Sequence, residues 1–266
     1  MARIFITGSA DGLGLSAARL LVEQGHSVVL HARSGARAED ARAALPEAEA
    51  VVIGDLSTIA AMREVAEQAN ARGSFDAVVH NVALGYREPR RVETVDGLSQ
   101  LWAVNVLAPY VLTALMHRPD RLVYLSSGMH LMGDPSLADP QWSARRWNGS
   151  QAYSDSKLHD VLIGFGVARR WPDVPTNMVN PGWVPTVMGG PGAPDDLDQA
   201  HRTQAWLAVG ADEGARRTGR FLYHRRPAEL HPAARDTELQ DRLLDHCRAV
   251  SGVTMSGTGK VVSRTG

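Results

Sequence analysis

The sequence predicts an α/β fold in which a doubly wound parallel sheet of about seven strands carries helices on both faces. Three observations predict it. Short apolar runs alternate with longer helix-like segments, a glycine-rich turn joins the first run to the first helix, and no internal repeat is present. Strands that are buried on both faces appear in a sequence as continuous apolar runs. The 266 residues suffice for one large core, and we expect residues 1–250 to form a single domain.

The elements follow in order from the amino-terminus. The apolar run 4–6 predicts a buried strand, and segment 13–24 has its apolar residues at helical spacing. Ser57 or Thr58 can cap the third helix, and Pro109 is expected to kink the fourth. The strands are expected at 4–6, 27–31, 50–54, 76–80, 122–126, 176–180 and 220–223. The helices are expected at 13–24, 36–45, 58–70, 94–116, 151–170 and 236–250.

Two long irregular stretches, 128–150 and 183–204, interrupt the alternation, and both follow predicted strands. They should therefore lie at the carboxyl edge of the sheet, where open α/β folds bind their ligands. Large apolar side chains in them suggest the walls of a hydrophobic pocket, although any one of them can simply pack its loop onto the sheet. These residues are Met129, Met132, Trp142, Trp147, Trp183 and Met188. Residues 251–266 are rich in Gly, Ser and Thr and are expected to form a flexible tail.

The composition narrows the functional classes. A net charge of -1 gives no electrostatic reason to expect nucleic acid or an anionic membrane as a partner. A single cysteine, Cys247, excludes an internal disulfide and suits a reducing compartment. No apolar stretch is long enough to span a membrane, and the first strand follows Met1 too closely for a signal peptide. We expect a cytoplasmic protein.

The turn at residues 7–14, Thr-Gly-Ser-Ala-Asp-Gly-Leu-Gly, lies between the first predicted strand and the first predicted helix. Glycines allow a tight turn and let the backbone approach a pyrophosphate, and the free N–H groups at the helix start then face the anion. An ordinary glycine-rich turn is the alternative. The strand–loop–helix context favours a dinucleotide-binding loop.

Tyr153 and Lys157 are four residues apart on a predicted helix and therefore lie on the same face. An ammonium beside a phenol favours the phenolate and lowers the pKa of the phenol, so that the tyrosine can exchange a proton during a reaction. Alone such a pair is weak evidence, because it also arises on solvated helix faces. The glycine loop upstream gives it weight.

Several further motifs follow in order: Asp55-Leu56, His80-Asn81-Val82-Ala83, Asn105, Ser126-Ser127 and residues 181–186, Pro-Gly-Trp-Val-Pro-Thr. Together with the glycine loop and the Tyr–Lys pair, they resemble the motifs of the short-chain dehydrogenase/reductase family across nearly the whole chain. The resemblance implies a single Rossmann-type domain that transfers hydride to or from a nicotinamide cofactor. His80, Val82 and Ala83 depart from the family's Asn-Asn-Ala-Gly motif, which bears on cofactor geometry more than on chemistry.

The resemblance also implies a role for each residue. Tyr153 is the expected acid/base, Ser127 hydrogen-bonds the substrate oxygen, Lys157 assists the tyrosine and holds the ribose, and Asn105 anchors a water linked to Lys157. The residues implied in cofactor binding are Gly8, Asp11, Gly12, Leu13, Gly14, Arg33, Asp55, Leu56, Asn81, Ala83, Tyr153, Lys157, Pro181, Gly182, Val184 and Thr186. No metal site is expected, because the histidines lack partners at metal-ligand spacing.

Ser127 and Tyr153 are 26 residues apart, which is longer than in many members of the family. This insertion and the Ser-Lys-Leu that ends at Leu158 resemble the retinol-dehydrogenase-like branch. That branch implies a small apolar carbonyl or alcohol substrate, without identifying it. The alternative is a sensor or scaffold that binds the dinucleotide without turnover, which would not need Tyr153 and Lys157.

The predicted cofactor is NADP(H) rather than NAD(H). The second strand is followed by Arg33, with Arg37 one helical turn further on, and no acid lies between Leu30 and Ala38. A guanidinium can pair with a 2′-phosphate and stack on adenine. Asp11 in the glycine loop is an opposing sign, and the alternative for Arg33 is a solvated arginine.

Small and apolar residues on the helix 151–170 suggest a homodimer contact: Val161, Gly164, Phe165 and Ala168. The alternative is that the insertion or the C-terminal segment covers this face and leaves a monomer.

Overall fold

The computed structural model describes residues 1–256. An eight-stranded sheet in the order β3-β2-β1-β4-β5-β6-β7-β8 forms its centre. Seven strands are parallel, and the last pairs antiparallel with β7. The strands are β1 (Arg3–Ile6), β2 (Ser27–Ala32), β3 (Ala50–Ile53), β4 (Ala77–His80), β5 (Arg121–Leu125), β6 (Thr176–Asn180), β7 (Arg220–Tyr223) and β8 (Arg226–Pro227). The predicted Rossmann-type α/β fold is confirmed, and β8 is the one strand that the sequence did not predict.

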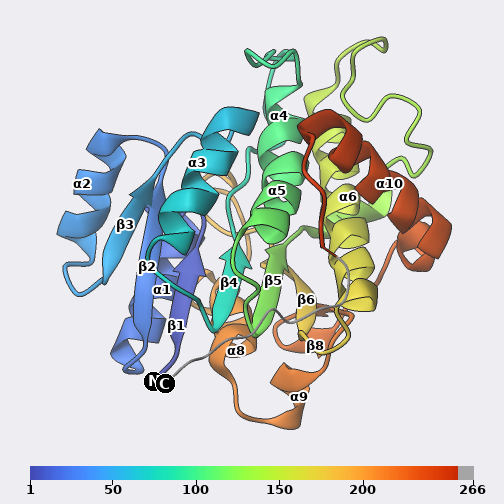
Figure 1. Ribbon diagram of the computed structural model, residues 1–266. Helices are drawn as coiled ribbons and strands as arrows, with labels where there is room; N and C mark the ends of the chain where they lie inside the picture. The colour runs from blue at the N-terminus through green and yellow to red at the C-terminus, as the bar shows by residue number, and fades with distance from the viewer. Residues whose placement is uncertain (257–266) are drawn as a thin grey trace.

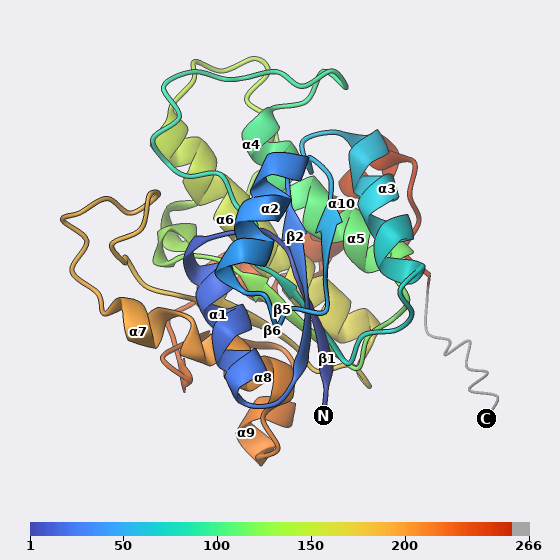
Figure 2. The same ribbon diagram turned by 90° about the vertical axis from the view of Figure 1, so that its left-hand side faces the viewer.

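Helices cover both faces of the sheet, as Figures 1 and 2 show in two perpendicular views. One face carries α3, α5, α6 and α10, and the other carries α1, α2 and α8. The helices are α1 (Gly12–Glu23), α2 (Gly35–Ala44), α3 (Ile59–Asn70), α4 (Gln100–Trp102), α5 (Ala108–Leu115), α6 (Gly149–Arg170), α7 (Leu197–Ala200), α8 (Arg202–Val209), α9 (Glu213–Arg216) and α10 (Thr237–Ser251). Shorter turns are η1 (Ala103–Leu107), η2 (Gly128–Met132) and η3 (Pro232–Arg235).

Residues along each strand alternate between the two layers. In β1, Phe5 packs with the α3–α5–α6 layer, while Ile4 and Ile6 pack with the α1–α2–α8 layer, and all three are fully buried. Successive side chains of a strand point to opposite faces. The uninterrupted apolar runs therefore reflect burial on both sides, and they fix the strand positions that the sequence predicts.

The prediction of a long helix at 94–116 is wrong about the residue at which the helix begins. Glu93 and Ser99 form an isolated antiparallel bridge, and Gly97 has a φ of +77° in the turn between them. The helix begins only at Gln100 and passes through the π-helical turn η1 before α5. Pro109 lies in the first turn of α5, directly after η1.

The segment 183–204, expected to be irregular, contains α7 and the start of α8. α8 packs on α1 and β5 through Ala205, Leu207 and Ala208, which are buried. Its apolar residues form one unbroken run, 205–209, and do not recur at helical spacing, which is why the periodicity alone did not show this helix.

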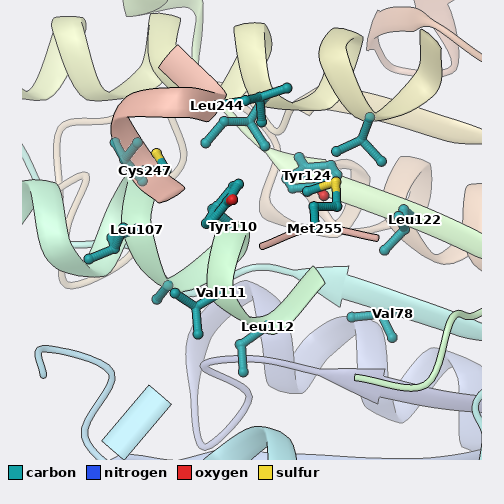
Figure 3. Packing of buried hydrophobic residues seen from close by; sticks show 14 of the residues in the cluster. Val78, Leu107, Tyr110, Val111, Leu112, Leu122, Tyr124, Leu244, Cys247 and Met255 are labelled. Carbon is teal, nitrogen blue, oxygen red and sulfur yellow. The ribbon is translucent and has the colours of Figure 1, made fainter. Parts of the chain in front are cut away.

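Residues 251–256 differ from the expected flexible tail. Val253 and Met255 are buried, and the Val253 carbonyl oxygen accepts a hydrogen bond from the Tyr110 hydroxyl at 2.9 Å. Figure 3 shows Met255 beside Tyr124 and Leu122. This segment therefore closes the α5–α10 layer, whereas the rest of the expected tail lies outside the described residues.

The α6 face expected to form a dimer contact is covered by the chain itself. Val161 is fully buried, and a Cβ at Gly164 would lie 2.4 Å from the sulfur of Met178 on β6. Phe165 is mostly buried and lies under the Arg235 guanidinium of η3. β6 and η3 therefore cover part of this face, and the homodimer stays a prediction.

Within residues 1–256, the helices are all too short or too polar to cross a bilayer.

Candidate active site

The glycine loop between β1 and α1 is open towards the helix start. Gly8 and Gly12 have φ values of +60° and +53°, which other residues rarely adopt. A Cβ at Gly14 would lie 2.5 Å from the Gly8 carbonyl oxygen, so this position also requires glycine. Asp11 precedes α1 without capping it through its side chain. The first N–H groups of α1 are therefore available to an anion.

His31, which the sequence analysis treated only as a strand residue, holds this loop in place. Its Nδ1 accepts a hydrogen bond from the Gly8 N–H at 3.0 Å, and its Nε2 lies 3.0 Å from the Gly54 carbonyl oxygen at the end of β3. These partners require a neutral ring with the proton on Nε2. Burial agrees, because it lowers the pKa of His31 to about 4.

Asn81 fastens the same loop to the end of β4. Its Nδ2 donates to the carbonyl oxygens of Thr7 and Gly8, at 3.0 and 2.9 Å. The Thr7 hydroxyl accepts from the N–H groups of Asn81 and Val82, at 3.0 and 3.1 Å. A Cβ at Gly8 would lie 2.9 Å from the Val82 Cα, so the two segments are in close contact.

The remaining predicted cofactor residues of this half lie around the loop. Leu13 begins α1 and is half-buried, as is Ala83 after β4. The Asp55 carboxylate accepts a bond from the Ser57 N–H at 3.0 Å, and Leu56 is buried. Asp55 and Leu56 follow β3 directly, so they lie at the carboxyl edge beside β2.

Two arginines behave differently at the end of β2. Arg37 forms ion pairs with Asp11 and, at 2.8 Å, with Asp40. Arg33 is exposed and makes no ion pair or side-chain hydrogen bond with residues 1–256. The charge of Asp11 is therefore already offset by Arg37, and Arg33 is the guanidinium left available beside the loop.

The catalytic candidates meet at the carboxyl end of β5. The Lys157 ammonium lies 5.7 Å from the centre of the Tyr153 ring. It donates to the Leu125 carbonyl oxygen at 2.9 Å and to the Asp160 carboxylate at 2.7 Å. Tyr153 is 6% exposed and Lys157 is 1% exposed. α6 thus presents both residues on one face, as their spacing predicts.

We expected the pKa of Tyr153 to be lowered towards neutrality, and the structure shows the opposite direction. Burial raises the pKa of this phenol, and the Lys157 charge and a hydrogen bond with Ser127 lower it by less. The net pKa lies above its ordinary value. The phenol is therefore protonated at neutral pH, ready to donate.

Ser127 begins η2, where its hydroxyl accepts a hydrogen bond from the Met129 N–H at 3.2 Å. His130, fully buried, supports it: its Nδ1 lies 2.7 Å from the Ser127 carbonyl oxygen, and its Nε2 accepts from the His231 N–H at 3.3 Å. The serine is thereby tied to the segment before η3. The sequence analysis assigned no role to this histidine.

Asn105 lies in the π-helical turn η1 and is fully buried. Its Oδ1 accepts from the Leu84 N–H at 2.7 Å, and its Nδ2 donates to the Leu84 carbonyl oxygen and to the Ser156 hydroxyl, each at 3.0 Å. The side chain therefore joins the segment after β4 to α6. This places Asn105 beside the Tyr153–Lys157 turn, and its role in holding a water stays a prediction.

The segment after β6 lies at the same edge of the sheet, because β6 is parallel to β5. Pro181 is half-buried and Val184 is buried. Gly182 has a φ of +93°, and a Cβ there would lie 2.5 Å from the Asp195 carboxylate. The Thr186 hydroxyl accepts a bond at 3.2 Å from the backbone N–H three residues later. All predicted site residues after β4, β5 and β6 thus lie at the edge that also carries the glycine loop.

Comparison with known proteins agrees with this geometry. A sequence model of the short chain dehydrogenases matches residues 2–131. An uncharacterised oxidoreductase of Emericella nidulans, AN7799, is 47% identical over 261 residues, which cover 97% of this chain and 100% of that protein. The chain belongs to the short-chain dehydrogenase/reductase family. Retinol dehydrogenase 14 of Homo sapiens is 30% identical over 70% of this chain and 62% of its own length.

Solved structures of other proteins show the same fold. An uncharacterised protein from Mycobacterium paratuberculosis superposes with a TM-score of 0.81 at 24% identity, covering 96% of this chain and 95% of its own. A blue fluorescent protein from a metagenomic library, in complex with NADPH, has a TM-score of 0.67 at 23% identity, covering 84% and 95%.

The insertion that distinguishes this short-chain dehydrogenase/reductase is fastened to α6 by one buried carboxylate. Asp155 accepts hydrogen bonds from Trp142 Nε1 at 3.1 Å, from Arg145 Nη2 at 2.8 Å, and from Gln151 Nε2 at 2.9 Å. The Arg145 guanidinium also lies 3.9 Å from the centre of the Trp142 ring. The insertion is therefore held next to the helix turn that carries Tyr153.

The large apolar side chains of the two loops divide into two groups. Trp142 is 7% exposed, and Trp147 donates to the Glu88 carbonyl oxygen at 2.9 Å, so both pack their own loop. Met132 and Trp183 are 70% and 51% exposed. Met132 and Trp183 are thus exposed enough to meet a ligand, and the hydrophobic pocket wall stays a prediction.

Four supporting residues were missed by the sequence analysis: His31, His130, Asp155 and Asp160. A sequence signal could have identified His31 and Asp160. Each is a polar residue at a position where the strand or helix pattern predicts a buried side chain. Among residues 1–256, no group of three or more metal-binding side chains is gathered.

Proposed function

We propose that the protein is an NADP(H)-dependent oxidoreductase that interconverts an apolar aldehyde or ketone and the corresponding alcohol. The observation that carries the proposal is the placement of Tyr153. Its ring centre lies 5.7 Å from the Lys157 ammonium, and Ser127 lowers the pKa of its phenol, at the edge that also carries the glycine loop. A dinucleotide on that loop would extend along the edge towards this group.

The residues of the loop fit the phosphates of a dinucleotide. Gly8, Gly12 and Gly14 leave a cradle that side chains would fill, and the first N–H groups of α1 are available. A bound nicotinamide supplies or accepts the hydride, which is chemistry that the side chains cannot perform. The protein contributes the proton and the orientation of the substrate.

In the reducing direction, the substrate oxygen accepts hydrogen bonds from Ser127 and Tyr153. Tyr153 then gives its proton to that oxygen as negative charge develops there. Lys157 stabilises the phenolate that remains, because an adjacent positive charge favours the ionised form. Asn105 holds the backbone after β4 against α6, which keeps the tyrosine turn in position.

The choice of NADP(H) over NAD(H) is supported by Arg33, which is exposed at the end of β2 without an acidic partner. Asp11 does not oppose a 2′-phosphate strongly, because Arg37 pairs with it. The blue fluorescent protein that shares the fold is described in complex with NADPH.

An apolar substrate is supported by the exposed side chains of Met132 and Trp183, which lie on the two loops of the carboxyl edge. Val187, in the second of these loops, is fully exposed. The likeness to a retinol dehydrogenase agrees with an apolar substrate class.

The test is NADPH consumption, followed by its absorbance, with a panel of aliphatic, aromatic and polyene aldehydes and ketones. We expect turnover with apolar members, slower turnover with charged ones, and less with NADH at equal concentration. Tight NADPH binding without turnover of any carbonyl would contradict the proposal and would indicate a sensor or scaffold instead.

A further inference from the structure

Asp160 lies one helical turn after Lys157 on α6 and has no part in the mechanism above. Its side chain is 3% exposed, and its Oδ2 accepts a hydrogen bond from the Lys157 ammonium at 2.7 Å. The ammonium donates a second bond to the Leu125 carbonyl oxygen at 2.9 Å. Two of its three N–H groups are therefore committed away from Tyr153.

A buried ion pair of this kind is poor evidence for a role in stability. Removing two charges from water costs about as much as their attraction returns, and well-packed apolar residues often replace such a pair without loss. Lys157, however, is needed as a cation beside Tyr153. The carboxylate is best explained by what it does to that cation.

Building on the proposed function, we propose that Asp160 is a positioning residue that fixes the Lys157 ammonium and offsets its charge at Tyr153, so that the enzyme favours carbonyl reduction. In that direction the carbonyl carbon gains the hydride supplied by NADPH. The carbonyl oxygen gains the Tyr153 proton, and the phenolate then recovers a proton from solvent. A tyrosine that keeps its proton suits this direction, whereas alcohol oxidation needs the phenolate.

The electrostatics at the pair agree with the geometry. The pKa of Asp160 is raised to about 6, because burial outweighs the effect of Lys157. The carboxylate is therefore ionised at pH values above about 6. Burial lowers the pKa of Lys157, but Asp160 and Tyr153 together raise it by more, so its net pKa lies above the ordinary value. The charge of Asp160 also raises the pKa of Tyr153.

Other ionisable groups lie on the elements that pack around the pair. Tyr124 on β5 is affected by the charge of Asp160, and its hydroxyl is 2.6 Å from the Thr113 hydroxyl. Tyr86 lies against Tyr153, with ring centroids 5.9 Å apart. β6 and η1 carry no ionisable side chain. The others on packed elements are Arg121 on β5, His130 on η2, Arg235 on η3, and Glu238, Asp241, Arg242, Asp245, His246, Cys247 and Arg248 on α10. Lys157 is the one charged group within residues 1–256 that shifts the pKa of Asp160.

The test is the pH profile of kcat/KM for carbonyl reduction by Asp160→Asn with NADPH. Reduction requires both the phenol and the ammonium to be protonated. The Asp160 charge stabilises the protonated forms of Tyr153 and Lys157. Without it, whichever of these two coupled groups titrates first loses its proton at a lower pH. We expect the alkaline limb of the profile to move down by about 1–2 pH units. Loss of packing alone would lower the rate without moving this limb.

Asp155→Asn is the matched control, because it also neutralises a buried carboxylate of α6, one that pairs with Arg145 instead of Lys157. Its limb should stay at the wild-type position, and Asp160→Glu, which keeps the charge, should stay close to it. A limb that does not move in Asp160→Asn, or moves equally in Asp155→Asn, would overturn the inference.

The wild-type enzyme provides a second test that needs no variant to fold. Its alkaline limb for reduction should lie above about pH 9, near or above the ordinary pKa of tyrosine. A limb at or below about pH 8 would overturn the inference and leave the oxidoreductase proposal intact. Failure of the oxidoreductase proposal is separate, since it shows as NADPH binding without turnover of any carbonyl.

Discussion

The two halves of the carboxyl edge are built with different polar chemistry. Around the glycine loop, the buried supports are neutral: His31 and Asn81 hold Gly8 through hydrogen bonds that involve no ionised group. Around Tyr153, the buried supports are charged: Lys157 pairs with Asp160, and Arg145 with Asp155. The fold is the same on both sides, so the difference reflects what each half has to do.

A loop that binds phosphates needs free N–H groups and no unpaired anion nearby, and Asp11 of this loop is paired with Arg37. Neutral supports hold the backbone in shape without competing for those groups or repelling the ligand. A site that moves a proton needs ionisable groups whose charges act strongly on one another, which burial provides. We therefore expect variants around Tyr153 to change the rate of reduction, and variants around the glycine loop to change cofactor binding or stability.

The largest effect is expected for Tyr153→Phe on the catalytic side. The phenylalanine keeps the ring's packing and removes the proposed proton donor, so kcat for reduction should fall by ~10²–10⁴-fold. The Kd for NADPH, measured by fluorescence titration, should change little. A variant that kept a kcat near the wild-type value on a good substrate would rule out Tyr153 as the acid.

Arg33→Ala on the cofactor side should have the opposite pattern. A charge-assisted bond to a phosphate contributes roughly 1.5–3 kcal/mol, so NADPH should bind about 10- to 100-fold more weakly. NADH binding and kcat at saturating NADPH should stay nearly unchanged. Arg42→Ala removes the same charge from the last turn of α2 and serves as the control. Equal losses for NADPH and NADH would refute the assignment of Arg33 to the 2′-phosphate.

The sequence predicted the sheet from local patterns, and the structure brings residues that the family resemblance named to one edge of that sheet. Tyr153 and Lys157 share a face through helical spacing, and the strand ends bring Ser127 and Asn81 to one edge. The pKa of Tyr153 could not be predicted in the same way. Its sign depends on how deeply the phenol is buried, which only the packed structure shows.

Long-range supports escaped the sequence for the same reason. The bonds of His31 join Gly8 and Gly54, which are far apart along the chain and meet only when β1, β2 and β3 pair. The helix predicted to begin at 94 begins only at Gln100, because Glu93 and Ser99 pair around a turn at Gly97 and that pairing has no periodic signature. The role of a residue such as His31 is evident only from its hydrogen-bond partners in the fold, and a single sequence does not show which residues those are.

The smallest effect concerns His31 and the stability of the cofactor half. Its folded pKa of about 4 lies below the ordinary 6.5, because burial disfavours the charged ring. Below pH 6.5 the unfolded chain takes up a proton that the folded chain refuses, so this contribution to stability is lost as pH falls from 6.5 towards 4. The free energy of unfolding should lose about 1.4 kcal/mol per pH unit from this residue across that window.

His31→Gln tests this directly, because an amide can accept from the Gly8 N–H and donate to the Gly54 carbonyl oxygen without titrating. Urea unfolding of both proteins between pH 7 and pH 5 should show a shallower decline for the variant, by about 2 kcal/mol at the lower pH. His80 and His159 are also buried, and their pKa values, lowered to about 3, add the same slope to both proteins, so they cancel in the difference. Parallel declines would mean that His31 is protonated in the fold. The neutral character of the cofactor half, and with it the contrast between the two halves, would then be wrong.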